Sequence, residues 1–168
     1  MINDYLKYIL LFLFSVLVQV LIFDNIYLIG YVNTFIYLLF ILMLPIEMNK
    51  YLVLFLGFIL GFSVDLFNST PGLNASATVL VCYLRPFVLN VFSPRDGYES
   101  NKTPSVKSYG LYWFIRYSLV IILIHHTFLF FLEVFSFTHF FYTVIKIILS
   151  SVSTLIFVFL GHLLFSGK

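Results

Sequence analysis

The residues of this sequence best suited to chemistry are isolated polar side chains in or beside long apolar runs. Asp65 lies near the end of one run, Arg85 lies within the next, and His125 and His126 stand together in a third. An ionisable side chain is costly in an apolar helix, so each is a candidate for function. Asp65 could make a proton, cation or partner contact, Arg85 could contact a partner within the membrane, and the histidines could take part in proton transport. A structural role, as a cap, an anchor or an interhelical hydrogen bond, is the alternative for each.

The two histidines are not expected to bind a metal. Adjacent residues of a helix point about 100° apart, so His125 and His126 cannot readily chelate one ion together. We expect one of them to form a structural hydrogen bond across the bundle, while proton transport stays open. The candidate partners are Gln19, Ser151 and His162.

The sequence contains none of the motifs typical of metalloproteases, phosphate-binding loops or serine hydrolases, and it has no cluster of carboxylates. We therefore assign no catalytic, cofactor-binding or metal-ligating residue and predict that the chain is not an enzyme. The single Cys82 excludes a disulfide framework.

The composition indicates a membrane protein. Of the 168 residues, 62% are hydrophobic, 21% aromatic and only 10% charged, and the mean hydropathy is +1.08. Soluble globular domains carry about 25% charged residues, so this chain has too few to cover a water-facing surface. The net charge of +2 is too small and too scattered for a nucleic-acid-binding surface.

Six apolar runs predict an all-α, polytopic protein with six transmembrane helices in one membrane domain over residues 1–168. Roughly 20 helical residues cross the hydrocarbon core. The second run is short for a crossing. The predicted spans are Tyr5–Phe23, Val32–Leu44, Tyr51–Phe67, Leu73–Phe92, Leu111–Leu132 and Tyr142–Leu164.

The basic residues in the connections and at the two ends of the chain fall on one side of the membrane in this topology, and the opposite connections contain no Lys or Arg. By the positive-inside rule both termini are cytoplasmic, and residues 93–108 form a mobile cytoplasmic loop between two three-helix halves. Lys146, within the last span, is expected to reach outward toward Glu133. The basic residues that set the orientation are Lys7, Lys50, Arg95, Lys102, Lys107 and Lys168.

The third span carries a stripe of small and polar residues. Gly57, Gly61 and Asp65 recur every four residues and so share one narrow helix face. Small residues at this spacing let another helix approach closely. We predict a partner-helix packing site here, and the sequence leaves open whether the partner belongs to this chain or to another protein. Asp65 itself has two interpretations: a cap on the following turn, or a proton, cation or partner contact.

The connection after this stripe is predicted to be a tight turn. Pro71 and Gly72 favour the turn, and Asn68 and Asn74 are assigned polar structural roles there. Thr70 or Asn74 is expected to cap the fourth span.

A charged residue and a proline lie side by side deeper in the fourth span. Arg85 is expected to be a membrane anchor that snorkels to the cytoplasmic interface, and an intramembrane contact is the alternative. Pro86 removes a backbone donor and is expected to bend the helix.

The segment LGFILGFSVDLFNSTPGLNASATVLVCYLRPFVL resembles the MreD family of bacterial rod-shape-determining membrane proteins. In that family a glycine-spaced helix ends in an acidic residue, and a short turn with Pro and Gly leads into the next helix. The matching residues here are Gly57, Gly61, Asp65, Pro71, Gly72 and Leu73.

The resemblance implies a non-enzymatic subunit of the cell-elongation complex in the bacterial cytoplasmic membrane, without a cofactor. Such a subunit binds the transmembrane helix of MreC. Directly or through MreC, it helps couple the MreB filament to peptidoglycan synthesis by RodA and a class B penicillin-binding protein. MreD is also similar in fold to the substrate-binding components of vitamin uptake transporters, which gives small-molecule uptake as the alternative function.

Overall fold

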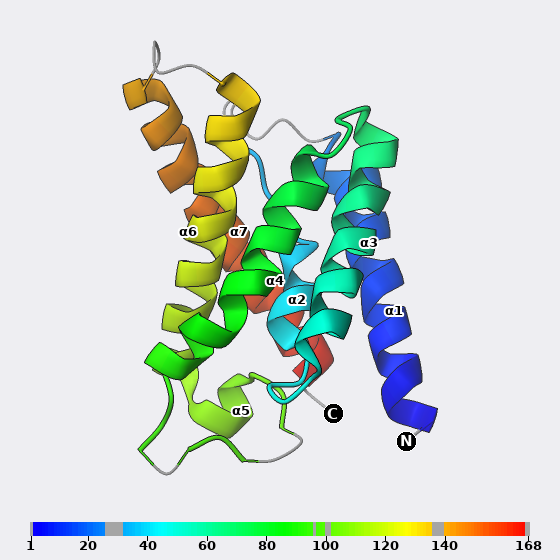
Figure 1. Ribbon diagram of the computed structural model, residues 1–168, viewed down its shortest axis with the longest axis vertical. Helices are drawn as coiled ribbons and strands as arrows, with labels where there is room; N and C mark the ends of the chain where they lie inside the picture. The colour runs from blue at the N-terminus through cyan, green and yellow to red at the C-terminus, as the bar shows by residue number, and fades with distance from the viewer. Residues whose placement is uncertain (1, 26–31, 96, 100–101, 136–139, 167–168) are drawn as a thin grey trace.

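The computed structural model describes residues 2–25, 32–95, 97–99, 102–135 and 140–166, which are almost entirely helical (Figure 1). The elements are α1 (Ile2–Val18), the π-helical turn η1 (Gln19–Phe23), α2 (Leu38–Met43), α3 (Lys50–Asn68), α4 (Leu73–Val91), α5 (Val106–Tyr109), α6 (Leu111–Val134) and α7 (Phe140–Ser166).

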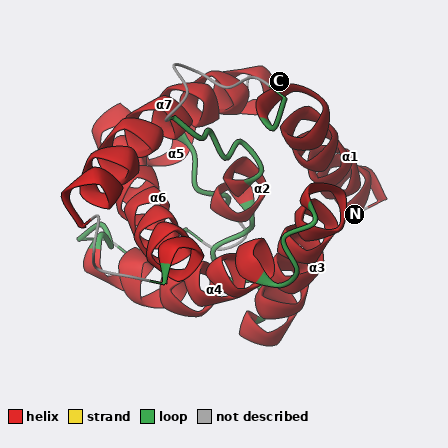
Figure 2. Cartoon of the chain, turned by 90° about the horizontal axis from the view of Figure 1, so that it is seen from above, coloured by secondary structure: helices red, strands yellow, loops and turns green. Residues whose placement is uncertain are grey.

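The long helices form a closed ring. Seen from above, α1, α3, α4, α6 and α7 surround the short α2 (Figure 2). Edge-to-face aromatic pairs close the ring between α7 and the first segments, α1 and η1. The ring centroids of Phe14 and Phe165 are 5.0 Å apart, and those of Phe23 and Phe157 are 4.8 Å apart. The expected helical bundle is therefore present, and most of its predicted spans match a long helix.

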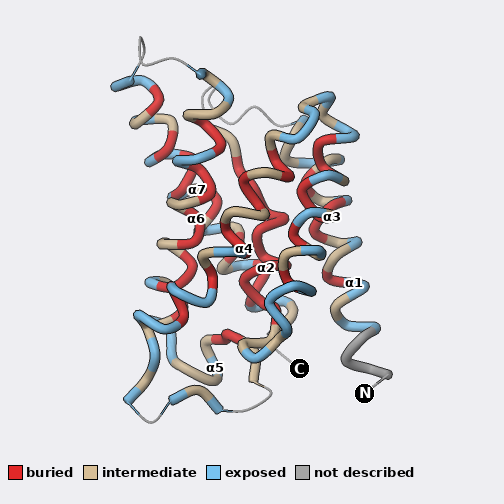
Figure 3. Tube along the Cα trace, in the orientation of Figure 1, coloured by how far each residue is buried: buried red, intermediate tan, exposed pale blue. Residues whose placement is uncertain are grey.

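The predicted second span is the exception. Instead of a crossing helix over Val32–Leu44, the chain has an extended stretch followed by the six-residue helix α2. Every residue from Thr34 to Leu44 is buried, so this stretch is the core of the ring (Figure 3). At about 1.5 Å per residue, α2 is far too short to cross a membrane. The run is apolar because other helices surround it.

Side chains of α7 supply hydrogen bonds that the extended stretch cannot make to itself. The backbone N–H of Asn33 donates to Ser150 Oγ at 3.0 Å, and the backbone N–H of Phe35 donates to Thr154 Oγ1 at 3.0 Å. Non-helical backbone is tolerated at membrane depth only where protein groups or water satisfy it. The hydroxyls of α7 therefore make the central segment, residues 32–44, compatible with its position.

Four helices of the described residues are long and apolar enough to cross a membrane, and α4 stands beside them in the ring. The chain is therefore an α-helical protein of multi-pass membrane character, while the six-span topology stays a prediction. The four candidate spans are Leu6–Phe23, Lys50–Asn68, Leu111–Val134 and Phe140–Phe165.

The two ends of the ring differ. Both chain termini lie at the end that also holds Lys50 and α5, which we call the basic end (Figure 1). The loop expected to be mobile packs against this end in its described part. The Tyr98 hydroxyl donates to the Leu89 carbonyl at 2.6 Å, and the Val106 amide donates to His162 Nε2 at 3.2 Å. The opposite end carries the α3–α4 turn and the end of α6.

Candidate functional site

The glycine stripe of α3 faces α4. A Cβ atom on Gly61 would lie 2.6 Å from both Ala75 Cα and the Asn74 carbonyl oxygen, far inside van der Waals contact. A Cβ atom on Gly57 would collide with Cys82 Sγ. The two helices therefore approach as closely as they do because neither position carries a side chain. Of the two arrangements that the sequence leaves open, the structure has the internal one.

Asp65 caps the beginning of α4 from the neighbouring helix. Its side chain is 2% exposed, and Oδ2 accepts from the Ala75 amide at 2.9 Å. Oδ1 accepts from the Asn74 amide and side-chain Nδ2, both at 3.0 Å, and from the Thr70 hydroxyl at 2.9 Å. The positive end of the α4 dipole adds to these bonds. The N-cap residue is Gly72, at φ 86°, so the expected cap by Thr70 or Asn74 is replaced by Asp65.

This geometry rules out the second arrangement, in which a helix of another protein packs on the stripe. Gly57, Gly61 and Asp65 are all buried against the chain's own α4, which leaves no room on that face for another protein. The exposed face of α3 carries large aromatic side chains instead, among them the stacked pair Phe58 and Phe62.

The remaining residues assigned to the turn lie where the chain passes from α3 to α4. Pro71 and Gly72 are exposed in the turn itself. Asn68 Nδ2 donates to Asp24 Oδ2 at 2.8 Å and so ties the end of α3 to the residue after η1. Asn74 points the other way, toward the ring interior, where its Oδ1 accepts from the Tyr37 hydroxyl at 3.1 Å.

The two histidines bind different groups in the ring interior. His125 Nε2 shares a hydrogen bond of 2.8 Å with the Tyr37 hydroxyl, and His126 Nε2 shares one of 3.1 Å with Thr154 Oγ1. The central segment, which the sequence did not place there, lies between the helices and supplies Tyr37. These bonds differ from the expected ones to Gln19, Ser151 or His162.

Arg85 makes its contacts inside the ring, and its side chain does not reach outward as a snorkelling anchor would. Its side chain is 2% exposed and donates from Nη2 to the Leu44 carbonyl at 2.5 Å, from Nη1 to the Pro45 carbonyl at 3.3 Å and from Nε to the Tyr117 hydroxyl at 3.0 Å. The last carbonyls of a helix lack partners, and α2 ends inside the ring. The guanidinium satisfies them and complements the negative end of the helix. Pro86 is exposed within α4, which stays helical on both sides of it.

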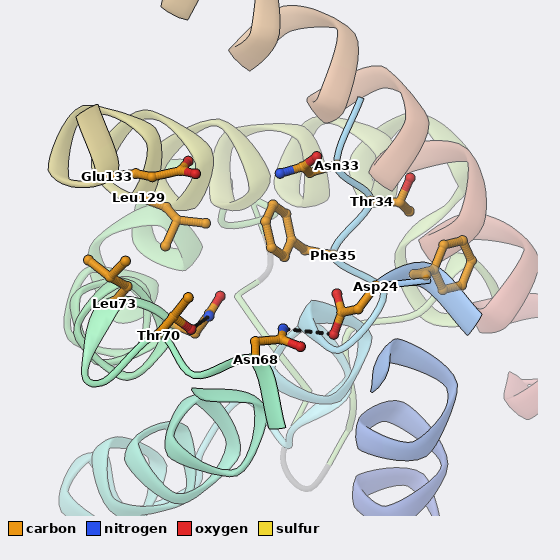
Figure 4. A pocket seen from close by; sticks show the side chains of 11 residues that line it. Asp24, Asn33, Thr34, Phe35, Asn68, Thr70, Leu73, Leu129 and Glu133 are labelled. Atoms are coloured by element: carbon orange, nitrogen blue, oxygen red, sulfur yellow. Dashed lines mark hydrogen bonds between the residues drawn. The ribbon is translucent and has the colours of Figure 1, made fainter. Parts of the chain in front are cut away.

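A pocket that the sequence did not predict lies at the opposite end. Its volume is about 310 Å³, and it opens among η1, the start of the central segment, the α3–α4 turn and the end of α6 (Figure 4). Most of its polar lining comes from residues of these segments: Asp24, Asn33, Asn68, Thr70, Asn74 and Glu133.

The charge of this pocket is negative. Asp24 accepts from Gln19 Nε2 at 2.7 Å and from Asn68 Nδ2, both neutral donors. Glu133 pairs with Lys146 at 3.1 Å, which confirms the contact predicted from the sequence. No Lys or Arg is among the described residues that line the pocket, so the charge of Asp24 is not compensated there.

The sequence carries a signal for the pocket. Asp24 and Glu133 fall at connections that contain no Lys or Arg, and this absence indicates a negatively charged end as well as the topology. Asn33 belongs to the run that was assigned to a crossing helix, so its position at a pocket could not be inferred.

The described residues contain no group of three or more His, Cys, Asp or Glu side chains that could hold a metal ion. Comparisons of the chain with protein-family models, with curated proteins and with solved structures find no match.

Proposed function

We propose that the protein is a non-enzymatic, MreD-type membrane subunit of the bacterial cell-elongation complex. In this role it binds MreC and helps couple the MreB filament to peptidoglycan synthesis by RodA and a class B penicillin-binding protein. The observation that supports the proposal is the α3–α4 hairpin. The residues that carry the resemblance act as one unit there: Gly57 and Gly61 permit close packing, and Asp65 caps the next helix.

The hairpin is structural, so the partner contact in this proposal lies elsewhere on the ring. The sides of α1 and α3 that face away from the ring interior are broad and apolar, as expected for surfaces that meet lipid or a transmembrane helix. Exposed residues on these sides include Leu10, Leu13 and Leu17 of α1 and Phe58 and Phe62 of α3.

The test combines cell shape with crosslinking. Depletion of the protein is expected to disturb rod shape, and a photoreactive residue at Leu13 or Phe58 is expected to capture MreC. A photoreactive residue at exposed Tyr112, near the start of α6, is the control and is expected not to capture MreC. Normal cell width and normal cell-wall insertion after depletion would overturn the proposal.

The pocket at the opposite end favours a second function, in which the protein is the small-molecule-binding component of an uptake system. A cavity of about 310 Å³ is at the lower end of the range for ligand sites. This function predicts saturable binding of a ligand to the purified protein. Substitutions at the pocket lining are expected to weaken that binding.

A further inference from the structure

We infer that the pocket at the opposite end recognises an organic ammonium group. The inference names the ligand class for the second proposed function and rests on it, because a ligand must first be able to enter the pocket. It follows from three features of the lining: an uncompensated carboxylate, aromatic rings and the absence of a basic side chain from its described residues.

The carboxylate is that of Asp24. Each of its oxygens accepts one hydrogen bond, from Gln19 Nε2 and from Asn68 Nδ2 respectively. An ionised carboxylate offers about four acceptor positions, and the described residues occupy two of them, which leaves two for donors of a ligand. Gln19 Nε2 also donates to the Thr34 carbonyl at 3.0 Å, which fixes the end of η1 to the central segment. The carboxylate is therefore held in place before any ligand arrives.

Aromatic rings line the same cavity. Phe35 is 7% exposed and lies beside the space that Asp24 and Asn68 border (Figure 4), and Phe23 lines the pocket as well. A ring face attracts an ammonium within about 6 Å of its centroid, and more strongly where water is scarce. A carboxylate together with aromatic rings suits a substituted ammonium, whereas an anionic ligand would meet no basic side chain in the described lining.

The amide of Asn68 offers an acceptor beside the carboxylate. Asn68 donates from Nδ2 to Asp24, and its side-chain oxygen accepts no hydrogen bond from the described residues. This oxygen is therefore available to an N–H group of a ligand, whereas Thr70 Oγ1 already accepts from Asn74 Nδ2 at 3.2 Å. The ammonium can belong to a free amine such as ethanolamine, or to the headgroup of a lipid that bends into the pocket from the membrane surface.

The experiment measures which charge the pocket admits. Asn33 is replaced by cysteine in the full-length protein, and the thiol is reacted with methanethiosulfonate reagents that carry a trimethylammonium or a sulfonate group. The wild type, whose single Cys82 is 2% exposed, is the control for background reaction. Ser69→Cys, an exposed position at the same end, gives the reference ratio of the two rates.

The cation-to-anion rate ratio at residue 33 is expected to exceed that at residue 69 by about tenfold or more, because a cleft of one charge concentrates its counter-ion. Equal ratios at the two positions would refute the ammonium inference while leaving an accessible pocket. Failure of both reagents to react at residue 33, with normal reaction at residue 69, would refute the second proposed function itself.

Protection distinguishes the two sources of the ammonium. Ethanolamine is expected to slow the reaction of Asn33→Cys with an uncharged thiol reagent if the ligand is a free amine. Slowing only in nanodiscs that contain phosphatidylethanolamine, and not in phosphatidylglycerol nanodiscs, identifies a lipid headgroup. Absence of protection in every condition contradicts the inference.

Two charge variants test whether the carboxylates of the lining cause the difference between the two reaction rates. Asp24→Asn in the Asn33→Cys chain is expected to reduce the ratio to that of residue 69. Because Asp24 also holds Gln19 and Asn68, Glu133→Gln is the second variant: it leaves Lys146 uncompensated beside the pocket without touching those bonds. A correctly folded Glu133→Gln protein with an unchanged ratio contradicts the electrostatic account.

Discussion

Replacing Asp65 with asparagine tests whether this carboxylate holds α3 and α4 together. The side chain is 2% exposed and accepts four hydrogen bonds, from Thr70, from two nitrogens of Asn74 and from the Ala75 amide. An asparagine has one oxygen and one NH2 group. Whichever way it is turned, the NH2 group faces at least one buried donor.

The cost follows from these contacts. A hydrogen bond to a charged group contributes about 1.5–3 kcal/mol, and a buried donor left without a partner costs about 1–3 kcal/mol. Loss of the negative charge at the beginning of α4 removes roughly another 0.3–1 kcal/mol. Part is offset because the variant no longer buries a charge. The free energy of unfolding is therefore expected to fall by about 2–4 kcal/mol.

The assay is unfolding in mixed micelles with increasing dodecyl sulfate, followed by circular dichroism. Glu133→Gln is the matched control, since Glu133 is a carboxylate at the same end whose side chain is 46% exposed. Its removal is expected to cost no more than about 1 kcal/mol. If Asp65→Asn lost no more stability than this control, the capping role of Asp65 would be wrong.

Three further predictions concern the packing and the basic end. Gly57→Ala is expected to lower the free energy of unfolding by about 1–3 kcal/mol, because the added methyl group collides with the Cys82 thiol. Cys82→Ala in the same chain is expected to restore most of this loss. If the unfolding assay shows no such rescue, the contact between residues 57 and 82 is contradicted. Arg85→Lys is expected to lower the free energy of unfolding by about 2–3 kcal/mol, because an ammonium cannot match the forked hydrogen bonds of the guanidinium. A loss below about 0.5 kcal/mol in the same assay would contradict a stabilising role for these bonds. Burial raises the pKa of Tyr98 from 10.0 to about 12, so its contribution to stability is complete below pH 10 and is lost as the pH rises toward 12. The ultraviolet difference titration of wild type against Tyr98→Phe is expected to show a midpoint near 12, and a midpoint at the ordinary tyrosine value contradicts the packed loop.

The long helices were predictable because their sequences differ sharply from the connections. The predicted third span, Tyr51–Phe67, corresponds to α3 over Lys50–Asn68, and the predicted fourth, Leu73–Phe92, corresponds to α4 over Leu73–Val91. Runs of apolar residues bounded by polar or turn residues identify such helices whatever surrounds them.

The central segment was not predictable, because an apolar run has the same composition whether lipid or other helices surround it. Residues 32–44 read as a weak crossing, whereas their extended part depends on Ser150 and Thr154, more than a hundred residues away in the sequence. The sequence could not decide between the two interpretations of Arg85 for the same reason. Its acceptors are the carbonyls at the end of α2, which exist only because α2 stops inside the ring.

The same limit applies to the candidate sites: local spacing was predictable, and contacts between distant segments were not. The spacing of Gly57, Gly61 and Asp65 correctly indicated a close-packed face, but spacing does not say which helix covers it. The pocket at the opposite end was missed because Asp24, Asn33 and Glu133 belong to three separate segments. Only the closure of the ring brings them together.

The most direct test of the sealed α3–α4 face uses the chain's single cysteine. A Cβ atom at residue 57 would lie 3.4 Å from Cys82 Cβ, close to the range of about 3.5–4.5 Å found in disulfides. Mild oxidation of Gly57→Cys in native membranes is therefore expected to give an intramolecular disulfide, seen as loss of both free thiols in a monomeric chain. Phe58→Cys, on the exposed face, is expected to keep its thiol free of Cys82. A thiol at residue 57 that stays free, or that crosslinks to another protein, would contradict the account.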